Sequence, residues 1–418
     1  MLHGIMKSLP IFLSALLFLS CSTLKHSSTA HALSTGGSET TIAQSIPLET
    51  DLANPAFAMA KDVWLQMIRE AQVSIDVAQF YVTNQAGSAL EDVIQELEKA
   101  GSRGIKIRFL LDSLMLSQDT PSIERLKKIP GLAFRVLNLK KITGGILHAK
   151  YWIIDGKRLF IGSQNFDWRA LEHIHEMGAL IENAALASQL TGIFEADWAM
   201  ALTNIPPVFA PKPGQPAAAP AGEIELVASP PEFNPPGTRS AIDALIPLIE
   251  GAKQQIRIQL LSYATQEKSY DSTKKDPAPW LVIDQALRAA RARGVQVQLL
   301  VADWSITGAE GESLKALVRQ GGVDVRYAKI PQFSSGPIPY ARVIHSKVMI
   351  VDHETLWLGT SNWSHGYFST SRNVELIFKG QQGLAASEQM NVSFNKVWNS
   401  AYVEKIDPGK DYPKASKN

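Results

Sequence analysis

The sequence is poor in cysteine, in net charge and in long apolar runs. Cys21 is the only cysteine among 418 residues, which excludes a fold held together by disulfides. The formal net charge is +1, so no overall basic field attracts polyanions, and nucleic-acid binding would need a local groove. The apolar run Leu9–Leu19 is too short to span a membrane. The remaining composition, with 45% hydrophobic residues, suits a globular chain long enough for two domains.

The N-terminal residues are expected to direct export. Lys7 and the apolar run after it have the pattern of a signal peptide over residues 1–20. Cys21 directly follows Phe18-Leu19-Ser20, which resembles the cleavage box of bacterial lipoproteins, so we favour lipidation of Cys21. Ordinary secretion, with cleavage after Ala30-His31-Ala32, is the alternative, and a spanning anchor is a third option. Residues 21–50 are predicted to form a flexible tether. We therefore expect a membrane-anchored lipoprotein in the bacterial periplasm or on the outer surface.

One pattern of residues occurs twice in the chain. The first copy is HAKYWIIDGKRLFIGSQN over residues 148–165, and the second is HSKVMIVDHETLWLGTSN over residues 345–362. The shared positions lie at a constant offset of 197 residues; they are His148/His345, Lys150/Lys347, Asp155/Asp352, Gly162/Gly359, Ser163/Thr360 and Asn165/Asn362. Two such strings in register indicate a duplicated functional unit rather than a chance match.

The spacing within the pattern predicts a hairpin that carries a phosphate site. Side chains at i and i+2 of a strand share a face, which places each His beside its Lys. The apolar residues that follow predict a buried strand, a turn at the Asp, and a second strand. The segment after the second strand brings a hydroxyl and an amide back towards the His and Lys. Imidazole, ammonium, hydroxyl and amide groups together suit phosphoryl transfer, with histidine as nucleophile or proton shuttle.

These two strings resemble the HxKxxxxD signature of the phospholipase D superfamily, which includes phospholipases, phosphatidyltransferases, nucleases and inactive relatives. The resemblance covers roughly residues 52–402. The closest likeness is to the animal lysosomal branch of membrane-anchored 5′-exonucleases, and poxvirus envelope proteins are similar in the same region. It rests on Ile338–Val343, Gly359–Ser364, Tyr367-Phe368, Asp167-Trp168-Arg169 and Phe194–Trp198. The chain departs from the animal members by lacking their disulfides.

The resemblance implies a role for each residue of the pattern. His148 would be the nucleophile and His345 the acid and base, although the two motifs are too symmetric for the sequence alone to assign them. Lys150, Lys347, Asn165 and Asn362 would hold the phosphoryl oxygens, with help from the hydroxyls of Ser163 and Thr360. Asp155 and Asp352 are expected to be structural. The family also places a carboxylate after each motif, for which Glu176 and Glu375 are the candidates; as an alternative, both are simple strand-end charges. No metal and no cofactor is expected.

The rest of the chain repeats around the two motifs. Strands are expected at 73–82, 105–112 and 132–137 with helices at 88–100 and 123–128 between them, and strands at 256–263, 294–303 and 323–327 with helices at 281–293 and 312–320. We predict tandem α/β/α sandwich domains with mixed, largely parallel sheets, related by a pseudo-two-fold axis with one active site at the interface. Their boundaries are expected at residues 51–205 and 238–405, separated by a Pro-rich linker at 206–237 and followed by a tail at 406–418.

The predicted activity is phosphodiester cleavage through a covalent phosphohistidine, with phospholipid as the favoured substrate. Three alternatives stay open: a 5′-exonuclease on single-stranded nucleic acid, a phosphatidyltransferase of the cardiolipin-synthase type, and a catalytically silent binding protein. Trp363, Tyr367 and Phe368 could stack on bases, contact acyl chains, or simply belong to the core. The protein is expected to be a monomer or a homodimer.

Overall fold

The computed structural model describes Met1 and residues 33–35, 38–207, 209, 222–267, 278–415 and 417. The predicted signal peptide and Cys21 lie outside these residues, so export and lipidation remain predictions. Among the helices of the described ranges, none combines the length and the apolar character that a membrane crossing requires.

The first half of the chain folds around one mixed sheet. Most predicted elements form within a few residues of the expected bounds, because their apolar residues recur with the period of a helix or a strand. The elements are β1 (Leu33–Thr35), β2 (Ser38–Ser45), β3 (Ala58–Met59), α1 (Ala60–Glu70), β4 (Ser74–Gln79), β5 (Val82–Thr83), α2 (Ala89–Ser102), β6 (Lys106–Asp112), α3 (Thr120–Lys127), β7 (Leu132–Leu137), α4 (Leu139–Thr143), β8 (Tyr151–Ile154), β9 (Arg158–Gly162), β10 (Phe166–Asp167), α5 (Trp168–Glu172), β11 (Glu176–Glu182) and α6 (Ala184–Thr203).

The second half repeats this order around a second sheet. Its elements are β12 (Ile224–Ser229), η1 (Pro231–Phe233), β13 (Arg239–Ser240), α7 (Ala241–Gly251), β14 (Gln255–Gln259), α8 (Val282–Ala292), β15 (Gln296–Ala302), η2 (Asp303–Ser305), α9 (Gly308–Gly321), β16 (Asp324–Ala328), β17 (Val348–Val351), β18 (Thr355–Gly359), α10 (His365–Ser369), β19 (Asn373–Phe378), α11 (Gly380–Trp398) and β20 (Val403–Lys405).

The two sheets have matching strand orders. The first runs β1-β2-β11-β9-β8-β4-β6-β7, and the second runs β13-β12-β19-β18-β17-β14-β15-β16-β20. The duplicated α/β architecture that the sequence predicts is therefore confirmed. The sheets are mixed. Apart from the short pairs β2-β3 and β12-β13, parallel pairing is confined to β4-β6-β7 and β14-β15-β16. The expectation of largely parallel sheets is wrong for the other half of each sheet, because the motif hairpins and the strands that follow them pair antiparallel.

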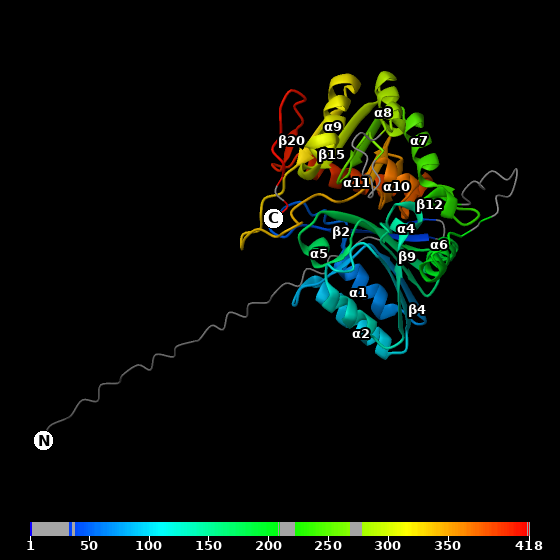
Figure 1. Cartoon of the computed structure of the whole chain (residues 1–418). Helices are drawn as coiled ribbons and strands as arrows, with labels where there is room; N and C mark the ends of the chain where they lie inside the picture. The colour runs from blue at the N-terminus through cyan, green and yellow to red at the C-terminus, as the bar shows by residue number, and fades with distance from the viewer. Residues whose placement is uncertain are drawn as a thin grey trace.

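The molecule is layered, with the two sheets stacked about a shared centre (Figure 1). Helices α1 and α2 cover the outer face of the first sheet, and α7, α8 and α9 cover the outer face of the second. Between the sheets lie α6 and α11, whose residues Phe194, Trp198, Phe394 and Trp398 belong to one core that also contains strand residues of both halves. Since apolar burial is the main driving force of folding, this common core ties the halves together.

Two predicted boundaries are wrong. The sequence predicts a tether that runs to residue 50, but Ser38–Ser45 form β2, which pairs with β11 over Glu39–Ser45. The linker was expected to run to residue 237, but Ile224–Ser229 form β12, which pairs antiparallel with β19. Both strands are buried, and they complete the side of each sheet next to the motif hairpins. The sequence patterns missed them because each strand lies beside a stretch rich in small residues or proline.

Asp155 and Asp352 hold the turns of the two motif hairpins. Both residues adopt a left-handed backbone, with φ of 55° and 51°, which Asp tolerates better than most residues. The Asp155 carboxylate accepts hydrogen bonds from three consecutive backbone N–H groups, at residues 72, 73 and 74. Asp352 does the same for residues 253, 254 and 255. Each Asp thus fastens a hairpin turn to the start of the neighbouring strand, β4 or β14.

Replacing Asp352 by Ala is expected to lower the free energy of unfolding by about 1–3 kcal/mol, because three backbone donors lose their acceptor. Partial burial raises the pKa of Asp352, but the backbone donors outweigh it and hold the pKa below its ordinary value of 3.8. A lowered carboxylate pKa stabilises the fold above the ordinary value, and the stabilisation is lost as the pH falls through the folded-state pKa. The difference between wild type and variant in urea unfolding should therefore be largest near pH 7 and should shrink as the pH falls below 3.8. Asp62→Ala, in the exposed first turn of α1, is the control. A difference that is as large below pH 3.8 as at pH 7 would contradict this role.

Candidate active site

The two halves pair with each other through short segments next to the motifs. Leu147 pairs with Arg372, and His175 pairs with Ile344, as two isolated parallel bridges. The same offset of 197 residues relates one bridge to the other. The backbone N–H groups of His148 and His345 donate to the carbonyls of Arg372 and His175, at 2.9 and 2.8 Å. The backbone of each motif histidine is therefore held by the residue of the opposite half that precedes β19 or β11.

The histidines and lysines stand just before the strands rather than in them. The motif strands begin at Tyr151 and Val348, one residue after Lys150 and Lys347. The predicted pairing of each His with its Lys on one strand face therefore does not apply. Instead, each lysine ammonium donates to the carbonyl oxygen of its own motif histidine.

His148 is held by Asn373. The Nδ1 atom of His148 lies 3.0 Å from Asn373 Oδ1. This oxygen also accepts from the Thr360 hydroxyl at 3.0 Å, while Asn373 Nδ2 donates to the carbonyl of Tyr367 at 2.8 Å. Because an amide oxygen can only accept, His148 carries its proton on Nδ1, and the lone pair of Nε2 is free. Burial and the charges of Lys150 and Lys347 lower the pKa of His148, so the ring is neutral and suited to nucleophilic attack.

His345 is held by Glu176. Its Nδ1 atom lies 2.8 and 2.9 Å from the two carboxylate oxygens of this fully buried side chain. Burial lowers the pKa of His345, reinforced by Lys347 and Lys150, and raises the pKa of Glu176 to about 8. The imidazole and the carboxylate share one proton in addition to the one that a neutral imidazole carries. The pair retains this shared proton up to about pH 8, on one group or the other. The pair is therefore equipped to donate a proton.

Glu375, the second predicted carboxylate, does not contact a catalytic histidine. It is fully buried and accepts a hydrogen bond from the Ser361 hydroxyl. Burial raises the pKa of Glu375 to about 8, so the side chain is largely neutral at pH 7. The prediction of a carboxylate after each motif that serves the site is therefore wrong for Glu375, and the amide of Asn373 holds His148 instead. The signal was present in the sequence: the offset of 197 residues carries Glu176 onto Asn373, and Gly178 onto Glu375.

Ser163 and Thr360 form hydrogen bonds to the backbone of the strands β11 and β19. The Ser163 hydroxyl exchanges hydrogen bonds with the backbone of Met177, at 3.2 and 3.1 Å. Thr360 makes the equivalent contacts with Val374 and also donates to Asn373. Both residues are completely buried. Instead of contacting a phosphoryl group, as the sequence predicts, the two hydroxyls fix the strands that carry Glu176 and Asn373.

The two lysines place positive charge beneath the histidines. Lys150 and Lys347 are each 1% exposed. Burial lowers the pKa of Lys347 to about 7, although the Glu176 carboxylate opposes the shift. Burial and the neighbouring Lys347 lower the pKa of Lys150. A bound phosphodiester would add a negative charge and favour the ammonium forms, so the lysines are suited to holding a phosphoryl group.

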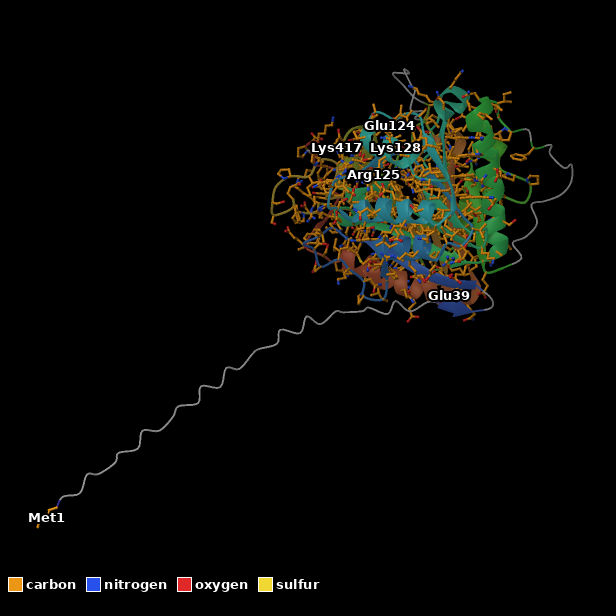
Figure 2. The ribbon with its side chains drawn as sticks, turned by 90° about the horizontal axis from the view of Figure 1, so that it is seen from below. Met1, Glu39, Glu124, Arg125, Lys128 and Lys417 are labelled. Carbon is orange, nitrogen blue, oxygen red and sulfur yellow. The ribbon has the colours of Figure 1, made fainter. Side chains whose placement is uncertain are left out.

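One pocket of about 410 Å³ joins the two halves of the site. Both histidines line it together with Asn165 and Asn362, so the structure brings these four predicted residues to one surface. The pocket is rich in aromatic side chains and contains two cations, but none of its lining residues is acidic; the aromatic and cationic members are Phe80, Tyr81, Trp304, Tyr340, Tyr367, Arg169 and Lys417. Lys417 is labelled at the surface of the folded body in Figure 2.

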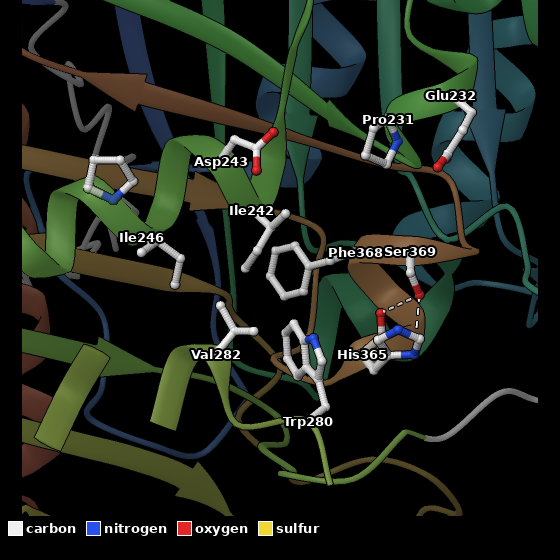
Figure 3. A pocket seen from close by; sticks show the side chains of 11 residues that line it. Pro231, Glu232, Ile242, Asp243, Ile246, Trp280, Val282, His365, Phe368 and Ser369 are labelled. Carbon is white, nitrogen blue, oxygen red and sulfur yellow. Dashed lines mark hydrogen bonds between the residues drawn. The ribbon is translucent and has the colours of Figure 1, made fainter. Parts of the chain in front are cut away.

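Of the aromatic residues predicted after the second motif, one reaches the catalytic pocket. The Tyr367 ring lies edge-on to His148, with centroids 4.8 Å apart. Trp363 is completely buried in the core of the second half. Phe368 lines a different pocket of about 570 Å³ beside α10, shown in Figure 3 with Trp280 and Ile242. The charged groups of that second pocket are the carboxylates of Glu232 and Asp243, which would repel a phosphodiester.

Comparison with known proteins agrees with this site. A family model described as "Cardiolipin synthase, PLD-like domain" matches residues 64–198 and 245–398, so the chain belongs to the phospholipase D superfamily and is a phosphodiesterase. It is 30% identical over 409 residues to the "5'-3' exonuclease PLD4" of Mus musculus, an alignment covering 88% of this chain and 79% of the other. It is 31% identical over 393 residues to "Phospholipase D Z" of Dictyostelium discoideum, covering 88% and 90%.

The fold has a counterpart among solved structures. The chain resembles the phosphatidylserine synthase of Haemophilus influenzae, with a TM-score of 0.59 at 13% sequence identity. The match covers 83% of this chain and 85% of that one. The likeness confirms the duplicated architecture that the sequence predicts.

Glu176→Gln and Glu375→Gln form a matched pair of variants. Without the Glu176 carboxylate, the extra proton can stay only on His345, whose pKa is lowered. The descending limb of kcat against pH should therefore move from about pH 8 to below 6.5, and activity at pH 7.5 should fall about 100-fold, a typical loss for general acid catalysis. Glu375→Gln replaces a largely neutral side chain by a neutral one, and should keep kcat within a few-fold and leave the pH profile in place. Equal losses in the two variants would contradict the assignment.

Proposed function

We propose that this protein hydrolyses phosphodiester bonds in single-stranded nucleic acid, removing nucleotides from the 5′ end through a phosphohistidine intermediate. The observation that carries the proposal is the lining of the catalytic pocket, which combines aromatic rings and cations with no carboxylate. Proteins that bind single strands use this combination, because rings stack on bases and cations follow the phosphates. It also supplies the local groove that a chain of net charge +1 needs to bind a polyanion.

In the proposed mechanism the two histidines have unequal roles. The Nε2 lone pair of His148 attacks phosphorus and forms the P–N bond. The bond between phosphorus and the leaving oxygen breaks, and that oxygen takes a proton from Nε2 of His345. Water then gives a proton to His345 and attacks phosphorus, which breaks the P–N bond and restores both histidines. The amide groups of Asn165 and Asn362, with Lys150 and Lys347 beneath them, stabilise charge on the other phosphoryl oxygens.

Two further observations favour a nucleic acid. Curated relatives from several vertebrates, including Mus musculus and Bos taurus, bear the name 5'-3' exonuclease at 30% identity over most of the chain. The pocket volume of about 410 Å³ falls within the range typical of small-molecule sites, which suits one nucleotide unit better than a lipid with two acyl chains. Phospholipid, the substrate favoured from the sequence, remains the second candidate because of the likeness to "Phospholipase D Z". The intact motifs argue against a silent binding protein.

A paired assay with His148→Ala as control should distinguish these substrates. One arm offers the purified protein a 5′-hydroxyl single-stranded oligonucleotide, and the other offers vesicles of phosphatidylcholine and phosphatidylglycerol. We expect stepwise nucleotide release by the wild type and a loss of at least about 1000-fold in the variant, since the covalent step has no other nucleophile. Release of choline or phosphatidic acid by the wild type alone would favour the lipid reading. New lipid species on addition of glycerol would indicate a phosphatidyltransferase.

A further inference from the structure

A short loop before the second motif displays one tyrosine at the catalytic pocket. Tyr340 lines the same pocket as His148 and His345, yet its side chain is 58% exposed. It is the only aromatic residue among the exposed large hydrophobic side chains of the described ranges. A single exposed apolar side chain is ordinary on a protein surface, but this ring is distinguished by its place in the pocket that both motif histidines line.

The backbone of this loop is strained. Tyr340 and Arg342 both have left-handed φ values, of 58° and 56°. For residues with a bulky side chain this conformation costs free energy, and it persists where the surrounding structure enforces it. Strain of this kind is concentrated at ligand-binding positions.

Hydrogen bonds on both sides of the tyrosine enforce this geometry. The Arg169 guanidinium donates to the carbonyl of Pro339 at 2.9 Å. The Tyr340 N–H donates to the carbonyl of Lys417 at 2.8 Å. The buried side chain of Arg342 donates to the carbonyls of Pro331 and Leu48, at 2.6 and 2.7 Å. The ring is thus presented from a rigid support, and little conformational entropy is lost when a ligand covers it.

The surroundings of the ring indicate what covers it. Arg169 and Lys417 line the pocket with Tyr340, and the Lys417 ammonium lies 4.9 Å from the centroid of the Trp304 ring. The guanidinium of Arg169 is paired with the buried Asp167 carboxylate at 2.8 Å, so Lys417 is the more available cation. An exposed aromatic face beside an ammonium group, in a pocket whose lining has no carboxylate, matches a base attached to a phosphate.

We propose that Tyr340 is the platform on which a nucleobase next to the scissile phosphodiester stacks, which makes it a residue that selects nucleotide substrates over other phosphodiesters. The inference rests on the proposed nuclease function. Stacking does not read hydrogen-bonding groups, so the platform should accept all bases but fail for a nucleotide that has none.

The test combines two substrates with two enzymes, each as the whole chain. The substrates are a 5′-hydroxyl oligothymidylate and the same strand with an abasic residue at the first or the second position. For the wild type, kcat/KM should fall about 5- to 150-fold at one of these positions, the range expected for loss of one base–aromatic stack. Tyr340→Ala should cleave the intact strand more slowly by the same factor and should be insensitive to the abasic residue. Its unchanged rate on the abasic strand would show that the variant is folded.

Two control variants sharpen the result. Tyr340→Phe keeps the ring and should retain the discrimination between the two strands. Tyr412→Ala removes a partly exposed tyrosine that packs on Tyr327 rather than in the pocket, and should behave as the wild type. If Tyr340→Ala and the wild type lose the same factor on the abasic strand, the inference is overturned although the nuclease function stands. If the wild type cleaves neither strand, the proposed function itself is overturned, and this inference with it.

Discussion

The candidate active site depends on backbone pairing between the two halves of the chain, at the residues that lead into the motif strands. The segment that leads into each motif pairs with the residue that precedes β19 or β11 in the other half, through Leu147 with Arg372 and Ile344 with His175. The buried Arg372 guanidinium stabilises this pairing. It forms an ion pair with Asp197 of α6 at 2.8 Å and donates hydrogen bonds to Ser229, Phe233 and Asn234. Each motif histidine takes its Nδ1 partner from the other half, and residues of both halves line the pocket, so the site requires both halves to be docked.

The pairing between the halves gives an almost symmetric fold two histidines with chemically different partners. Equivalent positions supply an amide to His148 and a carboxylate to His345. A neutral partner leaves one ring with a free lone pair, whereas an anionic partner lets the other retain a proton among two lysines. Phosphoryl transfer needs one group of each kind at the same pH, and a single difference, Glu176 against Asn373, separates their roles.

The repeat made much of this site predictable from the sequence. The offset between the motifs located both histidines, both lysines and both asparagines, because these residue types are costly to bury unless they are used. Asp155 and Asp352 were also recognised as structural. The prediction for Glu375 is wrong because closeness to the motif in sequence does not identify the equivalent position, whereas the offset of 197 residues relates Glu176 to Asn373. The left-handed backbone and the exposure of Tyr340, and the two strands β2 and β12, could not be predicted from the sequence, since they depend on tertiary contacts rather than local pattern.

The most direct test is to locate the covalent phosphoryl group in His148→Ala and His345→Ala. A p-nitrophenyl phosphodiester of a nucleotide has a leaving group that needs no acid, so it isolates the nucleophilic step. The account predicts that His345→Ala releases about one equivalent of p-nitrophenol and accumulates phosphohistidine at position 148, seen by mass spectrometry after alkaline quenching. His148→Ala should give neither burst nor adduct. An adduct on His345 in the His148→Ala variant, with none in His345→Ala, would contradict the roles that Asn373 and Glu176 assign.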